Sequence, residues 1–252
     1  MQFSPRAVRY LRHLVPCAAV LLAGTTALAA DCTPRDLPPY DAAGKGGWAH
    51  VPLSKLKRDT KYAPAKEDGR SLLKATAEDA ASAFVHFEPS DPAKLPVLEW
   101  SWRVPALIEK ADNRDPKKED SPARLIVGFD GDKSKLPDAE QRRFALAKKV
   151  SGRDAPFATL MYIWSNRDPV GTVIPSAHSE QLRMIVVESG GGGVGAWRNY
   201  RRNLAEDYRL AFGAAPGPML GVALMTDTDN TNAKAQGHYG PIRLACATPA
   251  GK

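Results

Sequence analysis

Three features that would classify a sequence at once are scarce in this one. It has three cysteines in 252 residues, too few for a domain held together mainly by disulfides. No apolar run reaches the roughly 20 residues that a membrane-spanning helix needs. Basic residues outnumber acidic ones by 35 to 28, but the two signs are mixed along the chain. This mixing disfavours nucleic acid as a partner.

The sequence also lacks the short motifs of common hydrolases and nucleotide-binding enzymes. It has no Gly-x-Ser-x-Gly elbow, no His-Glu-x-x-His zinc motif and no P-loop. Its histidines are scattered without the spacing of zinc ligands. The composition, with 43% hydrophobic and 25% charged residues, is that of a globular domain. Nothing in these patterns is direct evidence for catalysis.

The first 29 residues have the pattern of a signal peptide. Three arginines precede an apolar run over residues 14–24, and a stretch of small residues follows and ends at Ala29. A transmembrane anchor is the alternative, but this run is about half the length of a spanning helix. We therefore expect an exported protein, periplasmic or secreted, with no transmembrane segment after the signal is removed. The mature chain is then a single domain over residues 30–252, and its formal charge falls from +7 to +4 when the three arginines are subtracted.

Removal of the signal peptide leaves two of the three cysteines. Cys17 is lost, and Cys32 and Cys246 remain near the two ends of the mature chain. An even number of cysteines in an oxidising compartment indicates a disulfide, with two unpaired thiols as the alternative. Because the first and last segments of a β-sandwich are often neighbours, we predict a Cys32–Cys246 disulfide.

Short apolar segments with period-two alternation predict a mainly β fold. In residues 98–104, Leu98, Trp100 and Trp102 alternate with polar residues, which predicts a half-buried strand with both tryptophans in the core. The alanine-rich residues 71–87 also alternate, and we interpret them as a hairpin although helix propensity competes. Further strands are predicted at residues 124–130, 157–164, 182–187, 219–225 and 242–246.

Two helices are predicted between the strands. Pro137, an acidic first turn and a basic last turn indicate a helix over residues 137–150. Asn203 with Glu206 resembles a capping box, and Gly213 supplies the end of a second, shorter helix. Because helices and strands do not alternate regularly, we predict one β-sandwich with two short helical insertions rather than a doubly wound α/β fold.

Seven segments, in this order, carry a resemblance to a known family. They are LEWSWRV (98–104), EDSPARL (119–125), FDGD (129–132), ATLMYIW (158–164), VVESG (186–190), RNLAEDY (202–208) and MTDTDNT (225–231). Over roughly residues 45–244 the chain resembles domain-of-unknown-function family 3047, whose members are exported bacterial proteins. The resemblance implies export and no assigned activity. The strand order is also similar to the galactose-binding-type jelly roll of many carbohydrate-binding modules.

Asp227, Asp229 and Asn230 are candidate metal ligands. They follow an apolar strand, where their oxygens could hold a hard cation such as Ca²⁺. The spacing is not that of an EF-hand, because Asn232 and His238 stand where that loop needs Gly and Glu. Side chains of this type also close turns by bonding their own backbone. A turn without metal is therefore the alternative.

Aromatic rings beside polar residues are candidate sugar platforms. Trp164 ends an apolar segment and is followed by Asn166 and Arg167, and Trp197 has similar polar neighbours. A ring in such a place can stack on the apolar face of a sugar, although packing at the rim of the sandwich is the alternative. The remaining candidate ligand-binding residues are the loop acids Asp120 and Asp130.

Two functions follow from these candidates. The first is a non-catalytic, exported β-sandwich that binds a glycan or a small polar ligand. The alternative is a carbohydrate-active hydrolase or lyase that uses carboxylates from the loops of Asp120, Asp130 and Asp227. Such an enzyme needs two acids about 5 to 10 Å apart, a distance that the sequence does not give.

Overall fold

The computed structural model describes residues 32–42, 46–67, 69–152 and 154–247. All of these residues belong to one compact unit, Asp31–Lys252. The predicted signal peptide and Cys17 lie outside the described residues.

The strands of the described chain form two seven-stranded sheets. We call the first of them sheet A. Its strand order is β1-β14-β6-β13-β4-β3, and β11 also pairs with β6. All of its pairings are antiparallel. Its strands are β1 (Arg35–Asp36), β3 (Lys61–Glu67), β4 (Arg70–Glu78), β6 (Val97–Arg103), β11 (Arg198–Asn203), β13 (Lys234–Tyr239) and β14 (Arg243–Ala245).

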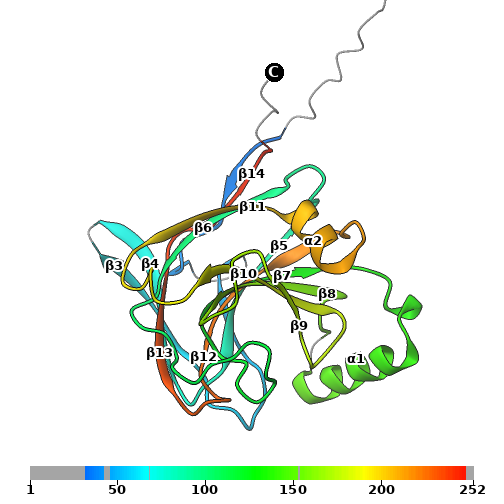
Figure 1. Cartoon of the computed structure of the whole chain (residues 1–252). Helices are drawn as coiled ribbons and strands as arrows, with labels where there is room; N and C mark the ends of the chain where they lie inside the picture. Colours follow the sequence, from blue (N-terminus) through cyan, green and yellow to red (C-terminus); the bar gives the residue numbers. More distant parts are fainter. Residues whose placement is uncertain (1–31, 43–45, 68, 153, 248–252) are drawn as a thin grey trace, which may run out of the picture. The chain divides into compact units, whose positions relative to one another are not determined.

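The second sheet, sheet B, has the order β2-β5-β12-β7-β8-β10-β9. Only β8 and β10 pair in parallel among these described strands. Its strands are β2 (Ala49–Pro52), β5 (Ser82–Ser90), β7 (Ser121–Phe129), β8 (Ala158–Ser165), β9 (Val173–Pro175), β10 (Leu182–Ser189) and β12 (Met219–Asp227). In Figure 1, β6 and β11 of sheet A pass above β7, β8 and β10 of sheet B.

The alternation in β6 places one face of sheet A in the core. Leu98, Trp100 and Trp102 are almost fully buried and pack with residues of sheet B. The Trp100 ring lies 4.9 Å from that of Tyr162 on β8, measured between centroids. The two sheets therefore pack face to face, and the predicted mainly β sandwich is confirmed.

The predicted hairpin over residues 71–87 is wrong in its pairing. Both strands form, but β4 pairs with β3 and β13 in sheet A, whereas β5 pairs with β2 and β12 in sheet B. The connection turns at Asp79, whose φ of 47° is left-handed, and Ala81 donates a backbone hydrogen bond to Arg58 O. Alternation predicts the strands, but it does not distinguish a hairpin from a turn that crosses the sandwich.

Both helical insertions form near their predicted positions. Helix α1 spans Asp138–Ser151 after a short 3-10 turn, η1 (Lys133–Lys135), and ends at Gly152 in the left-handed region. Helix α2 spans Leu204–Phe212, and the Asn203 side chain accepts hydrogen bonds from the backbone of Ala205 and Glu206. Among the described side chains of α1 only Glu140 is buried, so this helix contributes little to the core.

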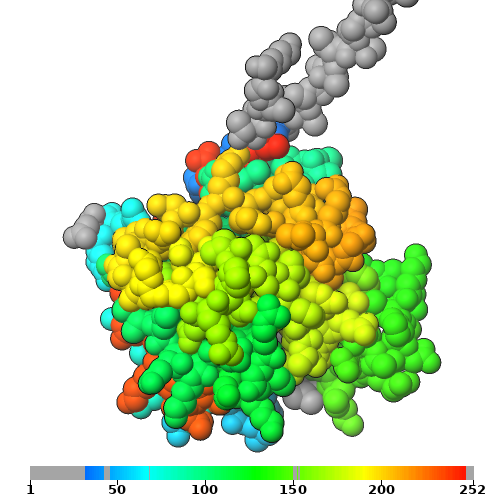
Figure 2. Space-filling view, in the orientation of Figure 1, coloured from blue at the N-terminus to red at the C-terminus, as the bar shows by residue number. Residues whose placement is uncertain are grey.

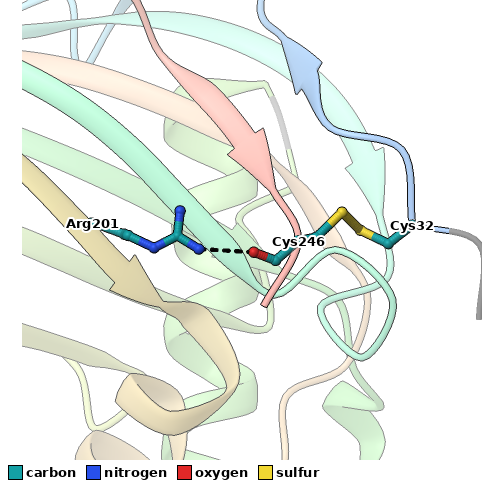
Figure 3. Close-up of a disulfide and its surroundings, with 3 residues drawn as sticks. All are labelled: Cys32, Arg201 and Cys246. Carbon is teal, nitrogen blue, oxygen red and sulfur yellow. Dashed lines mark hydrogen bonds between the residues drawn. A yellow bond between two sulfur atoms is a disulfide. The ribbon is translucent and has the colours of Figure 1, made fainter. Parts of the chain in front are cut away.

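The predicted Cys32–Cys246 disulfide is present. It joins residues 214 positions apart, and Arg201 of β11 donates a hydrogen bond of 2.9 Å to Cys246 O beside it (Figure 3). A bridge between such distant positions restricts the unfolded chain strongly. Within the described part of the chain, no helix is long and apolar enough to cross a membrane.

Candidate functional site

The loops at one end of the sandwich bring three of the predicted acids together. Carboxylate oxygens of Asp120, Asp227 and Asp229 lie within 4.8 Å of one another. Asp120 precedes β7, Asp227 ends β12 and Asp229 lies in the loop that follows. We call these three residues, with Arg124 of β7, the acid cluster.

The Asp227 carboxylate is already paired with the guanidinium group of Arg124. Arg124 Nε lies 2.9 Å from Asp227 Oδ1, Arg124 Nη2 lies 3.0 Å from Oδ2, and Ser121 N donates to Oδ1. Both charged side chains are buried. Burial raises the pKa of Asp227 to about 6 although Arg124 opposes the shift, so the carboxyl is ionised at neutral pH. This pair is an internal ion pair rather than an open site.

The other two carboxylates of the acid cluster also have partners. Asp120 accepts hydrogen bonds from the backbone of Asn230 and Thr231 and from the Thr231 hydroxyl. Asp229 forms an ion pair with Lys57. Ca²⁺ takes six to eight oxygen ligands, whereas these oxygens already accept from N–H and O–H groups. The donor set therefore fits a closed turn better than a calcium site.

Asn166 and Arg167 connect two of the loops at this end. Asn166 Nδ2 donates to the carbonyl oxygens of Ile108 and Ala111, at 2.7 and 3.1 Å, and Arg167 forms an ion pair with Asp112. Figure 2 shows the green residues of the β6–β7 loop next to the yellow-green residues of the β8–β9 loop. These two predicted ligand-binding residues hold loops together.

Trp164 is not an exposed platform, which corrects the prediction for this residue. Its side chain is 0% exposed, and its indole Nε1 donates to Gly190 O at 3.0 Å. The loop that follows β10 covers the ring, because the Cβ that Gly193 lacks would lie 3.2 Å from the Trp164 ring. The prediction placed the ring at a free strand end, whereas a loop distant in the sequence closes over it.

Asp130 lies apart from the other acids. Asp120 precedes β7 and Asp130 follows it, so a strand of roughly 30 Å separates the two. Asp130 is exposed, and its backbone N–H donates to Pro218 O. The loops of Asp120, Asp130 and Asp227 therefore do not form one carboxylate site.

Trp197 differs from Trp164 because its ring stays partly exposed. It directly precedes β11, and the guanidinium carbons of Arg70 and Arg103 lie 4.8 and 5.4 Å from its ring centroid. Arg103 alternates with the core residue Trp102 on β6, so it projects from the side of sheet A that faces away from the core. We call this side the outer face of sheet A.

His238 of β13 is the next residue across this face. It pairs with Arg103 on one side and with Lys74 of β4 on the other. Arg103 Nη2 lies 2.6 Å from His238 Nδ1, and because arginine only donates, Nδ1 accepts. The proton of the neutral ring is then on Nε2, a buried nitrogen that has no hydrogen-bond partner. Burial, with the Arg103 charge, lowers the pKa of His238 and keeps it neutral.

A hollow of about 480 Å³ continues the outer face beyond Trp197 and Arg103. Ser101 and Asn199 line its near end, because each lies two residues along its strand from Arg103 and Trp197. The other residues that line the hollow are Asp36, Glu99, Trp100, Tyr200, Arg201, Pro241 and Arg243. Of this surface, only Trp197 is predicted from the sequence. The alternating polar residues of β6 and β11 are the signal that could have identified the rest.

A family model described as "Protein of unknown function (DUF3047)" matches residues 46–243. The chain belongs to this family. The DUF3047 match extends from the segment before β2 to the first residue of β14, so it includes both the acid cluster and the outer face of sheet A. Among curated proteins, no match to this DUF3047 chain is found.

Solved structures with a distant likeness to the DUF3047 chain include three proteins that act on or bind carbohydrates. The family 12 xyloglucanase from Bacillus licheniformis has 9% identity and a TM-score of 0.44, with 85% of this chain and 99% of that chain covered. The family 11 carbohydrate-binding module of a Clostridium thermocellum cellulase has 8% identity and a TM-score of 0.42, covering 86% and 96%. The glycoside hydrolase domain of Endo-D from Streptococcus pneumoniae R6 has 10% identity and a TM-score of 0.36, covering 79% of this chain and 21% of that chain. This chain thus spans about a fifth of the Endo-D chain.

Proposed function

We propose that this protein is an exported, non-catalytic β-sandwich that binds a glycan on the outer face of sheet A. The observation that carries the proposal is the partly exposed Trp197 ring on the same face as a hollow of about 480 Å³, whose lining includes Asn199, two residues along the chain from Trp197. An indole ring offers an apolar face to a pyranose, and polar groups around it bind the hydroxyls. Ser101, Asn199 and Glu99 supply such groups in the hollow.

Export is supported by two independent features. The first 29 residues have the charge and hydropathy pattern of a signal peptide. The mature chain is also closed by the Cys32–Cys246 disulfide, which is typical of an oxidising compartment.

A non-catalytic role is favoured over a hydrolase or lyase that uses the loop acids. Asp120 and Asp227 are held by internal partners, and Asp130 lies at the opposite end of β7. On the outer face, Glu67 forms an ion pair with Arg103 of β6, and Glu99 forms one with Arg201 of the neighbouring strand β11. No pair of free carboxylates faces the hollow among the residues that line it.

The test is a glycan-array screen with the mature protein, followed by calorimetric titration of the best neutral or charged oligosaccharide. Trp197→Ala is expected to weaken binding about tenfold or more without loss of fold. Phe87→Ala is the matched control, because Phe87 is a 67% exposed aromatic residue on sheet B. Affinity that is equal in wild type and Trp197→Ala would contradict the proposed site. Release of new reducing ends during incubation would support the hydrolase instead.

A further inference from the structure

The outer face of sheet A carries more cations than acids around the proposed site. Arg70, Lys74 and Arg103 lie near Trp197, and Arg201 and Arg243 line the hollow. The acids near this site are Glu67, Glu99 and Asp36. With His238 neutral, these five cations and three acids give this part of the face a net charge of +2.

Three of the five cations are neutralised within the face. Arg103 forms an ion pair with Glu67, Arg201 with Glu99, and Arg243 with Asp36. Arg70 and Lys74 differ, because neither has a carboxylate partner among the described residues. Arg70 is exposed, and its guanidinium carbon lies 4.8 Å from the centroid of the Trp197 ring. Lys74 lies four residues further along the same strand and pairs with His238. The surplus charge is therefore on β4, with Arg70 directly beside the tryptophan.

Three residues of this face offer hydrogen-bond donors, namely Arg70 beside Trp197, and Lys74 and His238, which are opposite each other on β4 and β13. Arg70 offers five N–H groups, Lys74 offers an ammonium group, and His238 carries an N–H on its unpartnered Nε2. His238 is 5% exposed, so this nitrogen is unsatisfied inside the protein surface, which is a costly arrangement. A group rich in acceptors and carrying negative charge would satisfy what these three residues lack.

We propose that the glycan bound on this face is acidic, with a sugar carboxylate held by Arg70 beside Trp197 and with Lys74 adding positive charge to the same face. The inference rests on the proposed glycan-binding function and specifies its ligand class. Arginine binds a carboxylate through two parallel N–H groups, and the indole ring offers the pyranose an apolar face at the same place. A neutral glycan would leave both unpaired cations without a counter-charge.

The test compares acidic polysaccharides with their uncharged methyl esters. Oligomers of polygalacturonate and of alginate are titrated by calorimetry in acid and ester form, at low and at moderate salt. We expect the wild type to bind at least one acid form about tenfold more tightly than its ester, with the preference reduced by salt. Arg70→Gln with Lys74→Gln is expected to remove this preference.

Matched controls separate this inference from the proposed function. Arg142→Gln with Lys149→Gln removes two charges from α1, where neither side chain has an ion pair, and should leave all affinities unchanged. Equal affinity for acid and ester that still depends on Trp197 would overturn the acidic ligand and keep the glycan site. A preference for the acid form that survives Arg70→Gln with Lys74→Gln but is lost in the α1 variant would overturn the acidic ligand as well. Absence of binding to either form and to the array would overturn both proposals.

Discussion

The acid cluster and the outer face of sheet A contain similar residue types in opposite situations. In the acid cluster, Asp227 and Arg124 are buried and joined by two hydrogen bonds, and Asp229 is paired with Lys57. On the outer face, Arg70 and Lys74 have no carboxylate partner. The comparison shows that a charged motif indicates a ligand site only when its charges are not already neutralised by the fold.

Disruption of the buried ion pair should produce the largest effect. Arg124→Met leaves the Asp227 carboxylate in the interior without its cation, which should lower the free energy of unfolding at pH 7 by about 3 to 5 kcal/mol. Asp227→Asn combined with Arg124→Met removes both charges and should recover most of this loss. Urea denaturation of the three proteins measures the change. Wild-type stability in Arg124→Met would show that the pair does not hold the loops.

Trp164 and Trp197 should differ clearly in their contribution to stability. Trp164→Ala leaves a cavity in the core and should cost about 3 to 5 kcal/mol, whereas Trp197→Ala should cost less than about 1 kcal/mol because its ring lies on the surface. The melting temperatures of the two variants are compared with that of Trp102→Ala, which serves as the reference for a core tryptophan. A Trp197→Ala protein as unstable as Trp102→Ala would assign Trp197 to structure and weaken the proposed site.

The disulfide ties the outer face to the N-terminal segment, since Arg201 contacts Cys246 next to the bridge. Cys32→Ser with Cys246→Ser should lower the free energy of unfolding by about 2 to 4 kcal/mol, through the greater freedom of the unfolded chain. Reductant should destabilise the wild type and leave this variant unchanged. Mass spectrometry of the exported protein should detect no alkylatable thiol before reduction, and two free thiols would rule out the bridge.

Acid should reveal the raised pKa of Asp227. The carboxyl binds its proton more tightly in the folded state, at about 6, than at its ordinary value of 3.8. Its contribution to stability is therefore complete below about pH 4 and lost as pH rises to about 6, a decrease of up to about 3 kcal/mol. Urea denaturation at pH 4 to 7, with the Arg124→Met/Asp227→Asn double variant as reference, isolates the contribution of the Asp227 carboxyl to the free energy of unfolding. A stability difference between the two proteins that does not change with pH would contradict the shift.

Calcium should have the smallest effect. A bound ion at a hundredfold excess over its dissociation constant would add about 2.7 kcal/mol and raise the melting temperature by several degrees. Because the carboxylates of the acid cluster already have partners, we expect millimolar Ca²⁺ to shift the melting temperature by less than about 1 °C. A larger rise in the wild type that is absent in Asp229→Ala would restore the metal site at Asp227, Asp229 and Asn230.

Local patterns were sufficient for the strands with clear apolar alternation and for the ends of the helices. The alternation of Leu98, Trp100 and Trp102 places one face of β6 in the core, and Asn203 caps α2 as its spacing predicts. Strands with weak patterns were missed. β3 contains Pro64 and β11 is polar on both faces, so neither has the apolar alternation of a typical strand.

The candidate site shows where local patterns stop being informative. The sequence selects Trp164 and Trp197 by the same criterion, a ring beside polar residues, but a loop covers the first and leaves the second partly exposed. Asp227 and Asp229 look like metal ligands along the chain, yet their partners Arg124 and Lys57 come from other strands and loops. Such partners depend on contacts between distant segments.

By itself, the sequence determined the β class, the two helices and the disulfide, because these follow from periodicity, capping residues and cysteine count. Only the tertiary structure decided which charges are neutralised and which aromatic ring is accessible. Both properties depend on side chains that approach from other strands, such as Arg103 beside Trp197 and Arg124 beside Asp227. Hydrogen bonding and burial act between neighbours in space, whatever their separation along the chain.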